Sequence, residues 1–294
     1  MNLHMMDIRY GHVFNKTDLL DSEDDTDYID EHINENPIDK LYSKAAANDT
    51  SVSNDITPHE KIDKIINDIE DQEMKQLLTK WIYKHTSVFN DELSEQPARV
   101  KPYTIEMKEN NNWYENTANK APPRWQMIAK QREVKRFIDM ALKAKLIRPS
   151  NANAWSQVLL TPKQNDKWRF CLDFRNLNAQ SKAGGWPIPN IKHVIERISR
   201  TNARYFAVLD LTQGYYQMLI DESSRHLTAF RTAFGIYEWN RLPMGLKGAG
   251  SYYQSHMQNA VLTDLLYKIC ESYLDDILVY GRTKEELSTN LQSV

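Results

Sequence analysis

The chain lacks most features of secreted, membrane-bound or disulfide-stabilised proteins. Only two cysteines, Cys171 and Cys270, occur among its 294 residues, which argues against a disulfide framework or a cysteine-rich zinc site. No apolar run is long enough to cross a membrane, and the N-terminus lacks the apolar core of a secretion signal. We therefore expect an intracellular protein with no membrane partner; the sequence does not distinguish a cytoplasmic particle from the nucleus.

The net charge of −3 is the sum of two oppositely charged parts. Residues 1–98 contain 9 Lys and Arg against 22 Asp and Glu, a net of −13. Residues 99–294 contain 28 basic and 18 acidic residues, a net of +10. A basic body behind an acidic leader favours a polyanionic partner such as nucleic acid, although solvated surface charge alone commonly gives the same imbalance.

Composition divides the chain into three regions. Residues 1–55 are acidic and polar, which predicts a disordered leader. Residues 56–148 carry apolar residues at helical spacing, which predicts one helix from Pro58 through Ile82 and a second over residues 126–146.

In residues 149–294, short β-prone runs alternate with helical patterns and are joined mostly by hairpins. The runs at residues 158–161 and 168–172 are expected to form two paired strands around a turn at residues 164–167. Helices are expected near 191–198, over 247–266 and from Thr283 onward. This order predicts an α+β fold with a sheet covered by helices.

Residues 272–280 place two adjacent carboxylates, Asp275 and Asp276, between apolar β-prone runs. The pattern predicts a strand, a tight turn and a second strand, with the acids at the tip. A third acid, Asp210, follows the apolar run at residues 205–209. Three carboxylates on neighbouring strands would suit Mg²⁺ and a two-metal site for phosphoryl transfer. Taken singly, an Asp pair is more often a solvated turn, and Asp210 a strand-end acid that caps a loop.

Four segments, in order, resemble motifs of one family: residues 167–178, 209–217, 242–247 and 273–276. They are similar to the fingers segment, the first palm motif, the loop before the template-gripping helix, and the catalytic hairpin of reverse transcriptases. The match is to gypsy-type LTR retrotransposon Pol polyproteins in particular and covers roughly residues 60–294. It implies reverse-transcriptase fingers and palm, with an antiparallel palm sheet covered by helices.

The resemblance implies an RNA-directed DNA polymerase that transfers nucleotides from dNTPs to a primer 3′-hydroxyl on an RNA or DNA template. Asp210, Asp275 and Asp276 would be its catalytic and metal-binding residues. Asp210 and Asp275 would ligate two Mg²⁺ ions, with Mn²⁺ as an alternative, and Asp276 would support the site electrostatically. The carbonyl of Leu211 would lie near a metal.

Substrate-binding roles are also implied by the resemblance. Lys163 and Arg169 would reach the triphosphate, and a guanidinium suits bidentate phosphate contact. Tyr215 would be a steric gate against the ribose 2′-hydroxyl, or else a core tyrosine. Met244 and Gly245 would lie beneath the nucleotide base.

Other residues of these motifs fit packing roles better or depart from the family. Tyr216 is expected to pack in the core, and Asp173 and Arg175 to form a structural pair. Relatives commonly have Asn followed by Ala-Pro where this chain has Gly248, Ala249 and Gly250, which predicts a looser first turn of the following helix.

The chain stops at Val294, soon after the catalytic hairpin, so we expect truncation before the thumb at the end of a fingers and palm region spanning residues 149–294. The other Pol domains (thumb, RNase H, integrase and protease) are expected in a full polyprotein. One alternative is a truncated or degenerate remnant that at most binds nucleic acid or partners. Another is a viral RNA-directed RNA polymerase, against which the fingers motif and Tyr215 argue.

Overall fold

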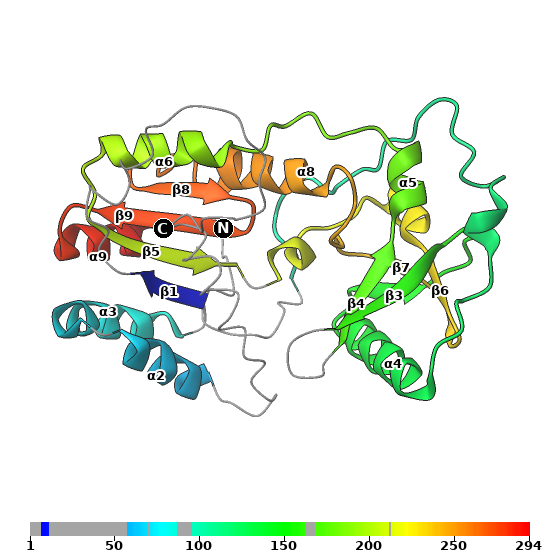
Figure 1. Cartoon of the computed structure of the whole chain (residues 1–294), viewed down its shortest axis with the longest axis horizontal. Coiled ribbons are helices and arrows are strands. Elements are labelled where there is room, and N and C mark those ends of the chain that lie inside the picture. Colours follow the sequence, from blue (N-terminus) through cyan, green and yellow to red (C-terminus); the bar gives the residue numbers. More distant parts are fainter. Residues whose placement is uncertain (1–6, 12–57, 70, 87–95, 163–167, 212) are drawn as a thin grey trace, which may run out of the picture. The chain divides into compact units, whose positions relative to one another are not determined.

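The computed structural model describes residues 7–11, 58–69, 71–86, 96–162, 168–211 and 213–294. The chain divides into two compact units, each assembled from segments that are separate in the sequence (Figure 1). Unit 1 consists mainly of Asp91–Ile188 and Thr212–Val261. Unit 2 consists of Met6–Asn90, Pro189–Leu211 and Leu262–Val294.

Unit 2 contains a four-stranded sheet in which every neighbouring pair of strands is antiparallel. In spatial order the strands are β1 (Asp7–Gly11), β5 (Tyr205–Asp210), β9 (Asp276–Gly281) and β8 (Cys270–Tyr273). The predicted hairpin is confirmed, because β8 and β9 pair directly and are joined by only two residues. This is the antiparallel palm sheet expected from the sequence.

In its described residues, this unit has four helices: α2 (Pro58–Asp68), α3 (Gln72–Lys84), α6 (Ile191–Arg200) and α9 (Lys284–Ser293). α6 packs Val194 and Ile198 against Phe206 and Tyr280, which are cross-strand partners on β5 and β9. α9 packs against the same two strands and is contacted by α3. The sheet is therefore covered by helices, as predicted.

The single helix predicted from Pro58 through Ile82 is wrong, because the structure breaks it into α2 and α3. The side chain of Asp71 accepts hydrogen bonds from the N–H groups of Glu73 and Met74 at 3.1 and 3.0 Å. These are main-chain donors that the first turn of a helix leaves unpaired. Asp71 therefore starts a second helix, while the apolar spacing continues across the break and conceals it.

The structure also differs from the expectation of a disordered leader over residues 1–55. Strand β1 pairs with β5 along its whole length, from Asp7 opposite Asp210 to Gly11 opposite Phe206. Its order comes from main-chain hydrogen bonds to a sheet edge, which composition does not report. The remainder of the leader lies outside the described residues.

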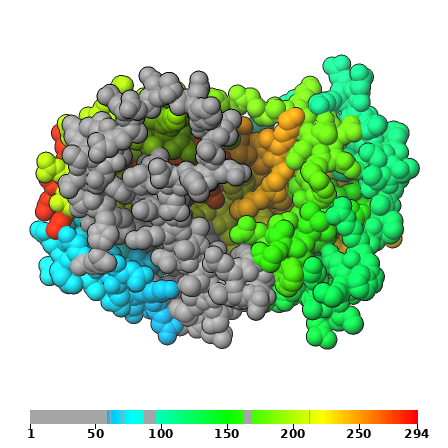
Figure 2. All heavy atoms as spheres, viewed as in Figure 1, coloured from blue at the N-terminus to red at the C-terminus, as the bar shows by residue number. Residues whose placement is uncertain are grey.

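Unit 1 contains a five-stranded sheet with one parallel pair, β3 with β6, among antiparallel ones. Its spatial order is β2 (Ile147–Pro149), β7 (Gly235–Trp239), β6 (Phe230–Thr232), β3 (Ser156–Pro162) and β4 (Trp168–Asp173). The pairing of β3 with β4 was predicted, and the turn between them lies outside the described residues. Helix α4 (Ile128–Lys143) stacks Phe137 on Phe170, with ring centroids 3.9 Å apart. Side chains fill the gaps that the ribbons leave in this unit (Figure 2).

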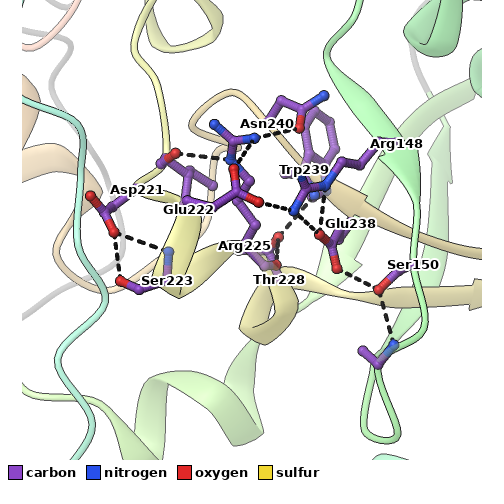
Figure 3. Close-up of polar contacts among 12 residues, drawn as sticks. Arg148, Ser150, Asp221, Glu222, Ser223, Arg225, Thr228, Glu238, Trp239 and Asn240 are labelled. Carbon is purple, nitrogen blue, oxygen red and sulfur yellow. Dashed lines mark hydrogen bonds and ion pairs between the residues drawn. The ribbon is translucent and has the colours of Figure 1, made fainter.

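A polar network ties β2 and β7 to the short helix α7 (Glu222–Arg225), as Figure 3 shows. Arg148 donates from Nε to the buried carboxylate of Glu238 at 2.8 Å and also pairs with Glu222. Arg225 contacts the other oxygen of Glu222 at 2.7 Å. Each buried or half-buried charge thus has a partner of opposite sign, which offsets its desolvation.

The remaining described elements of unit 1 are all helical. They are α5 (Arg175–Gln180), the 3₁₀ helices Thr117–Lys120, Gly214–Gln217 (η4) and His226–Thr228, and α8 (Ala249–His256), which continues as a π-helical turn, Met257–Val261. The helix predicted over residues 247–266 is therefore shorter than expected. In the described part of the chain, no helix is both long and apolar enough to span a membrane.

Candidate active site

The three predicted acids meet at one end of the β5–β9 strand pair in unit 2. β5 ends at Asp210 and β9 begins at Asp276, and the register places these residues directly opposite each other. Such cross-strand partners lie on the same face of a sheet, with Cβ atoms about 5 Å apart. Asp275 lies in the turn, and its carbonyl accepts a hydrogen bond from the Leu211 N–H at 3.0 Å. Backbone pairing therefore gathers all four predicted residues.

The two-residue turn that presents Asp275 has an unusual backbone. Leu274 adopts φ +54°, a left-handed conformation that costs a non-glycine residue on the order of 1 kcal/mol. The pairing of Tyr273 with Asp276 closes the turn on either side of it. Such local strain is retained when the surrounding structure over-determines it, and it occurs preferentially at functional sites.

Burial disfavours the charged form of Asp275, so the pKa of this carboxyl lies above its usual range. Among the residues that the structure describes, no three His, Cys, Asp or Glu side chains form a ready metal-binding group. The donor set of three carboxylates nevertheless has the chemistry that a hard divalent cation prefers. The metal-binding roles of Asp210, Asp275 and Asp276 remain predictions.

A buried ion pair supports the strand that precedes the turn, and the sequence analysis did not identify it. Glu271 on β8 is only 3% exposed and accepts two hydrogen bonds from Arg197 of α6, at 2.9 and 2.7 Å. Its carboxylate raises the pKa of the Arg197 guanidinium, which also lies 4.8 Å from the ring centre of Tyr267. In the sequence, this ion pair is indicated only by the position of an acid, Glu271, within a β-prone run.

The fingers motif of unit 1 contains one of the two predicted phosphate-binding cations, Arg169. Arg169 is exposed on β4, directly opposite Thr161 on β3. Lys163 lies outside the described residues. The predicted pair of Asp173 with Arg175 is confirmed: the guanidinium donates to both carboxylate oxygens at 2.7 Å and holds the pKa of Asp173 below its usual range.

Tyr215 lies on η4, where it is 9% exposed and stacks on Tyr253 of α8, with ring centroids 4.6 Å apart. A Cβ at Gly214 would lie only 2.3 Å from the Tyr253 hydroxyl, so this close packing requires glycine. Tyr216 stacks on Trp239 at 5.3 Å, and burial raises its pKa to about 12. The predicted packing role of Tyr216 is confirmed, whereas the gating role of Tyr215 remains a prediction.

The loop before α8 presents Met244, 57% exposed, next to Gly245 at φ +95°. Asn178 of α5 holds this loop, donating from Nδ2 to the Gly245 carbonyl and accepting at Oδ1 from the Lys247 N–H, both at 2.8 Å. Asn178 lies in the fingers motif, but no role for it was predicted from the sequence. A contact across 67 residues leaves no signal in local periodicity.

Comparison with known proteins agrees with this arrangement. The model of the family "Reverse transcriptase (RNA-dependent DNA polymerase)" matches residues 161–294. The retrovirus-related Pol polyprotein from transposon opus of Drosophila melanogaster is 37% identical over 167 residues, covering 55% of this chain and 16% of the relative. The corresponding polyprotein from transposon gypsy is 31% identical over 53% of this chain and 16% of its own length. The chain thus spans about a sixth of these relatives.

Solved structures show the same fold. The prototype foamy virus protease–reverse transcriptase, as a selenomethionine-labelled mutant, gives a TM-score of 0.66 at 22% identity, covering 81% of this chain and 31% of its own. A foamy viral protease–reverse transcriptase in complex with double-stranded DNA gives 0.64 at 19% identity, covering 81% of this chain and 41% of its own.

The fold is therefore that of reverse-transcriptase fingers and palm. Residues 161–294 match the model of the reverse transcriptase family, and the curated relatives described above are retrotransposon Pol polyproteins from opus and gypsy, so the chain is similar to RNA-directed DNA polymerases of such elements. The resemblance inferred from the four motifs is confirmed. Enzymes of this family generally use divalent metal ions.

Proposed function

We propose that the chain is the fingers and palm part of the RNA-directed DNA polymerase of a gypsy-type LTR retrotransposon. The observation that carries the proposal is the meeting of Asp210, Asp275 and Asp276 at one end of the β5–β9 pair. Residues 149–294 would form the polymerase region, preceded by the helical region 56–148 and the acidic leader 1–55. The reaction would join a dNTP to a primer 3′-hydroxyl and release pyrophosphate.

Asp210 and Asp275 would hold two Mg²⁺ ions, or Mn²⁺ in their place, with Asp276 and the Leu211 carbonyl close by. Bound there, divalent cations lower the pKa of a hydroxyl nucleophile and offset the charge on the transferring phosphoryl group. The strand register, which sets the backbones of Asp210 and Asp276 opposite each other, supports such a site because it needs no ligand to form. Such preorganised charge is the main contribution that a protein makes to phosphoryl transfer.

Unit 1 would bind the nucleotide. Exposed Arg169 would contact the triphosphate, with Lys163 as a second cation. Met244 and Gly245 would lie beneath the base, where glycine permits close approach of the backbone. Tyr215 would exclude a 2′-hydroxyl, the group that distinguishes ribonucleotides from deoxynucleotides.

The macromolecular partner would be a primer–template of RNA or DNA. Residues 99–294 carry a net charge of +10, which favours contacts with phosphates. Two foamy viral relatives in fold were solved with double-stranded DNA and with an RNA/DNA hybrid. The relatives in sequence are Pol polyproteins, so further Pol domains would act alongside this region.

Addition of a single labelled nucleotide to a primer on an RNA template tests the proposal. We expect incorporation of a dNTP with Mg²⁺, loss of incorporation on chelation, and recovery when the metal is restored. Absence of incorporation with both Mg²⁺ and Mn²⁺ would favour the inactive remnant. Preferential incorporation of ribonucleotides would favour an RNA polymerase.

A further inference from the structure

The start of α8 in unit 1 is enclosed by segments that are distant in sequence. Tyr103 is anchored there by its main chain: its N–H donates to the Leu219 carbonyl, and its carbonyl accepts from the Asp221 N–H, both at 2.8 Å. These two bonds form a parallel bridge between Tyr103 and Ile220. The backbone of Tyr103 is therefore held independently of α8.

The side chain of Tyr103 is directed at the first turn of α8. Its hydroxyl lies against Gly248, and its ring meets that of Tyr252 edge-on, with centroids 5.0 Å apart. The Tyr252 hydroxyl in turn donates to the carbonyl of Lys101. Two tyrosines, one from each segment, thus contact the opposite segment: Tyr252 by a hydrogen bond and Tyr103 by close packing against Gly248.

Gly248 has no room for a side chain while Tyr103 occupies this position. A Cβ at residue 248 would lie 2.4 Å from the Tyr103 hydroxyl oxygen, far inside van der Waals contact. Without that oxygen, the nearest atoms would be 3.4 Å away, at Tyr103 Cζ and the Gly184 nitrogen. The glycine that departs from the family pattern is therefore matched to one particular hydroxyl group.

Asn178 holds the same loop from its other end. Its side-chain amide bonds both the Gly245 carbonyl and the Lys247 N–H at 2.8 Å, so it spans the turn at Leu246. Gly245 has φ +95°, a conformation that side chains disfavour. The loop therefore depends on contacts from outside itself to keep this shape.

We propose that Tyr103 and Asn178 are positioning residues that hold residues 244–248 and the first turn of α8 in one conformation for the nucleotide. The inference rests on the proposed function, because it assigns this loop to nucleotide binding. Neither side chain needs to touch the nucleotide. A loop already in its bound shape loses less conformational entropy when the nucleotide binds. Substitutions that loosen the loop should therefore weaken the affinity for the nucleotide.

The match between Tyr103 and Gly248 is tested by rescue. Gly248→Ala should raise the KM for dNTP about tenfold and speed hydrogen exchange of the amides of residues 246–249. Adding Tyr103→Phe removes the clashing oxygen. In this double variant, the KM for dNTP and the exchange rate of these amides should both return to within about twofold of the values for Tyr103→Phe alone. Gly185→Ala is the control, because no atom lies within 4 Å of a Cβ there. Failure of Tyr103→Phe to relieve Gly248→Ala overturns the pairing.

The contribution of Asn178 is tested with Asn178→Ala, for which Asn110→Ala, at an exposed asparagine of the same unit, is the control. Loss of its bond to the Lys247 amide should speed exchange of that amide about fivefold. The KM for dNTP should rise while kcat changes less than about twofold. Unchanged exchange at Lys247 would refute the role of Asn178.

The exchange measurements need neither metal nor primer–template, so they separate this inference from the proposed function. If the wild-type chain adds no nucleotide but the variants loosen residues 244–249 as described, the loop is held as proposed and the assigned activity is wrong. If nucleotide addition is normal and all variants leave exchange and KM unchanged, the polymerase assignment stands and the positioning roles are wrong.

Discussion

Two short loops each carry residues of the predicted site, and they are stabilised in different ways. The β8–β9 turn of unit 2 is fixed by strand pairing, with main-chain hydrogen bonds on both of its sides. Residues 244–248 of unit 1 are held largely by side chains from other segments, above all Asn178 and Tyr103. Strand register tolerates changes of side chain, whereas a loop held by side chains can be loosened by a single substitution.

This comparison indicates a division of roles between the units. The carboxylates proposed for catalysis lie where their spacing depends on the backbone. The residues proposed for nucleotide selection lie where side-chain changes can adjust fit. Substitutions at the turn should therefore change kcat, and substitutions around the loop should change KM or selectivity.

The largest expected effect is at the turn itself. Asp275→Asn keeps the shape of the side chain but removes its charge, so nucleotide addition should fall at least about a hundredfold. Burial raises the pKa of Asp275, so removing its charge should not lower the thermal unfolding temperature. The measurements are single-turnover incorporation and thermal unfolding. Near-normal incorporation by a folded variant would contradict the catalytic role.

Next in size is the effect of Tyr215 on sugar selection. Tyr215→Ala should lower the ratio of deoxynucleotide to ribonucleotide incorporation by at least about tenfold, because it removes a ring proposed to clash with the 2′-hydroxyl. Tyr215→Phe keeps the ring and its stacking on Tyr253, and it serves as the control. If the alanine variant loses stability but keeps the wild-type ratio, Tyr215 is a packing residue only.

A smaller effect, on stability, is expected behind the turn. Arg197→Met should lower the free energy of unfolding by about 2 kcal/mol, because it leaves the buried Glu271 carboxylate unpaired; the partial exposure of Arg197 limits the loss. The double variant with Glu271→Gln should recover much of this difference. Urea unfolding at constant m value measures both. Equal stabilities of the single and double variants would show that the pair is not coupled.

The smallest effect concerns Lys284 on α9, which contacts Asp71 and Glu73 of α3 at 2.7 Å. The hydrogen bond from Lys284 is the main cause that lowers the pKa of Asp71. At pH values between this lowered pKa and the unfolded value of about 4, the folded state therefore binds fewer protons than the unfolded state. The stabilisation is present above about pH 4 and is lost as the pH falls through the lowered pKa of Asp71.

Lys284→Met should therefore be slightly less stable than the wild type at pH 6, and the two curves should converge as the pH falls through the lowered pKa of Asp71. Thermal unfolding against pH measures the difference, and nucleotide addition at neutral pH should not change. A constant difference at every pH would indicate lost packing instead of an ion pair.

Features encoded by local patterns could be predicted from the sequence. The carboxylates at the hairpin tip follow from two β-prone flanks, and the start of α9 follows from Thr283, whose side chain accepts from the Glu286 N–H at 3.2 Å. The break at Asp71 was missed because the apolar spacing of α2 and α3 runs through it. The roles of Asn178 and Tyr103 could not be predicted, because they depend on contacts between distant segments.

Strand β1 has a consequence for solubility. It occupies the edge of β5 that is not paired with β9, from Phe206 to Asp210. A shortened chain that begins after Gly11 would leave the main-chain N–H and C=O groups of that edge unpaired, and exposed edges recruit strands from other molecules. Such a chain would be prone to self-association, and its apparent loss of activity would reflect aggregation at this edge even though every proposed catalytic residue is present.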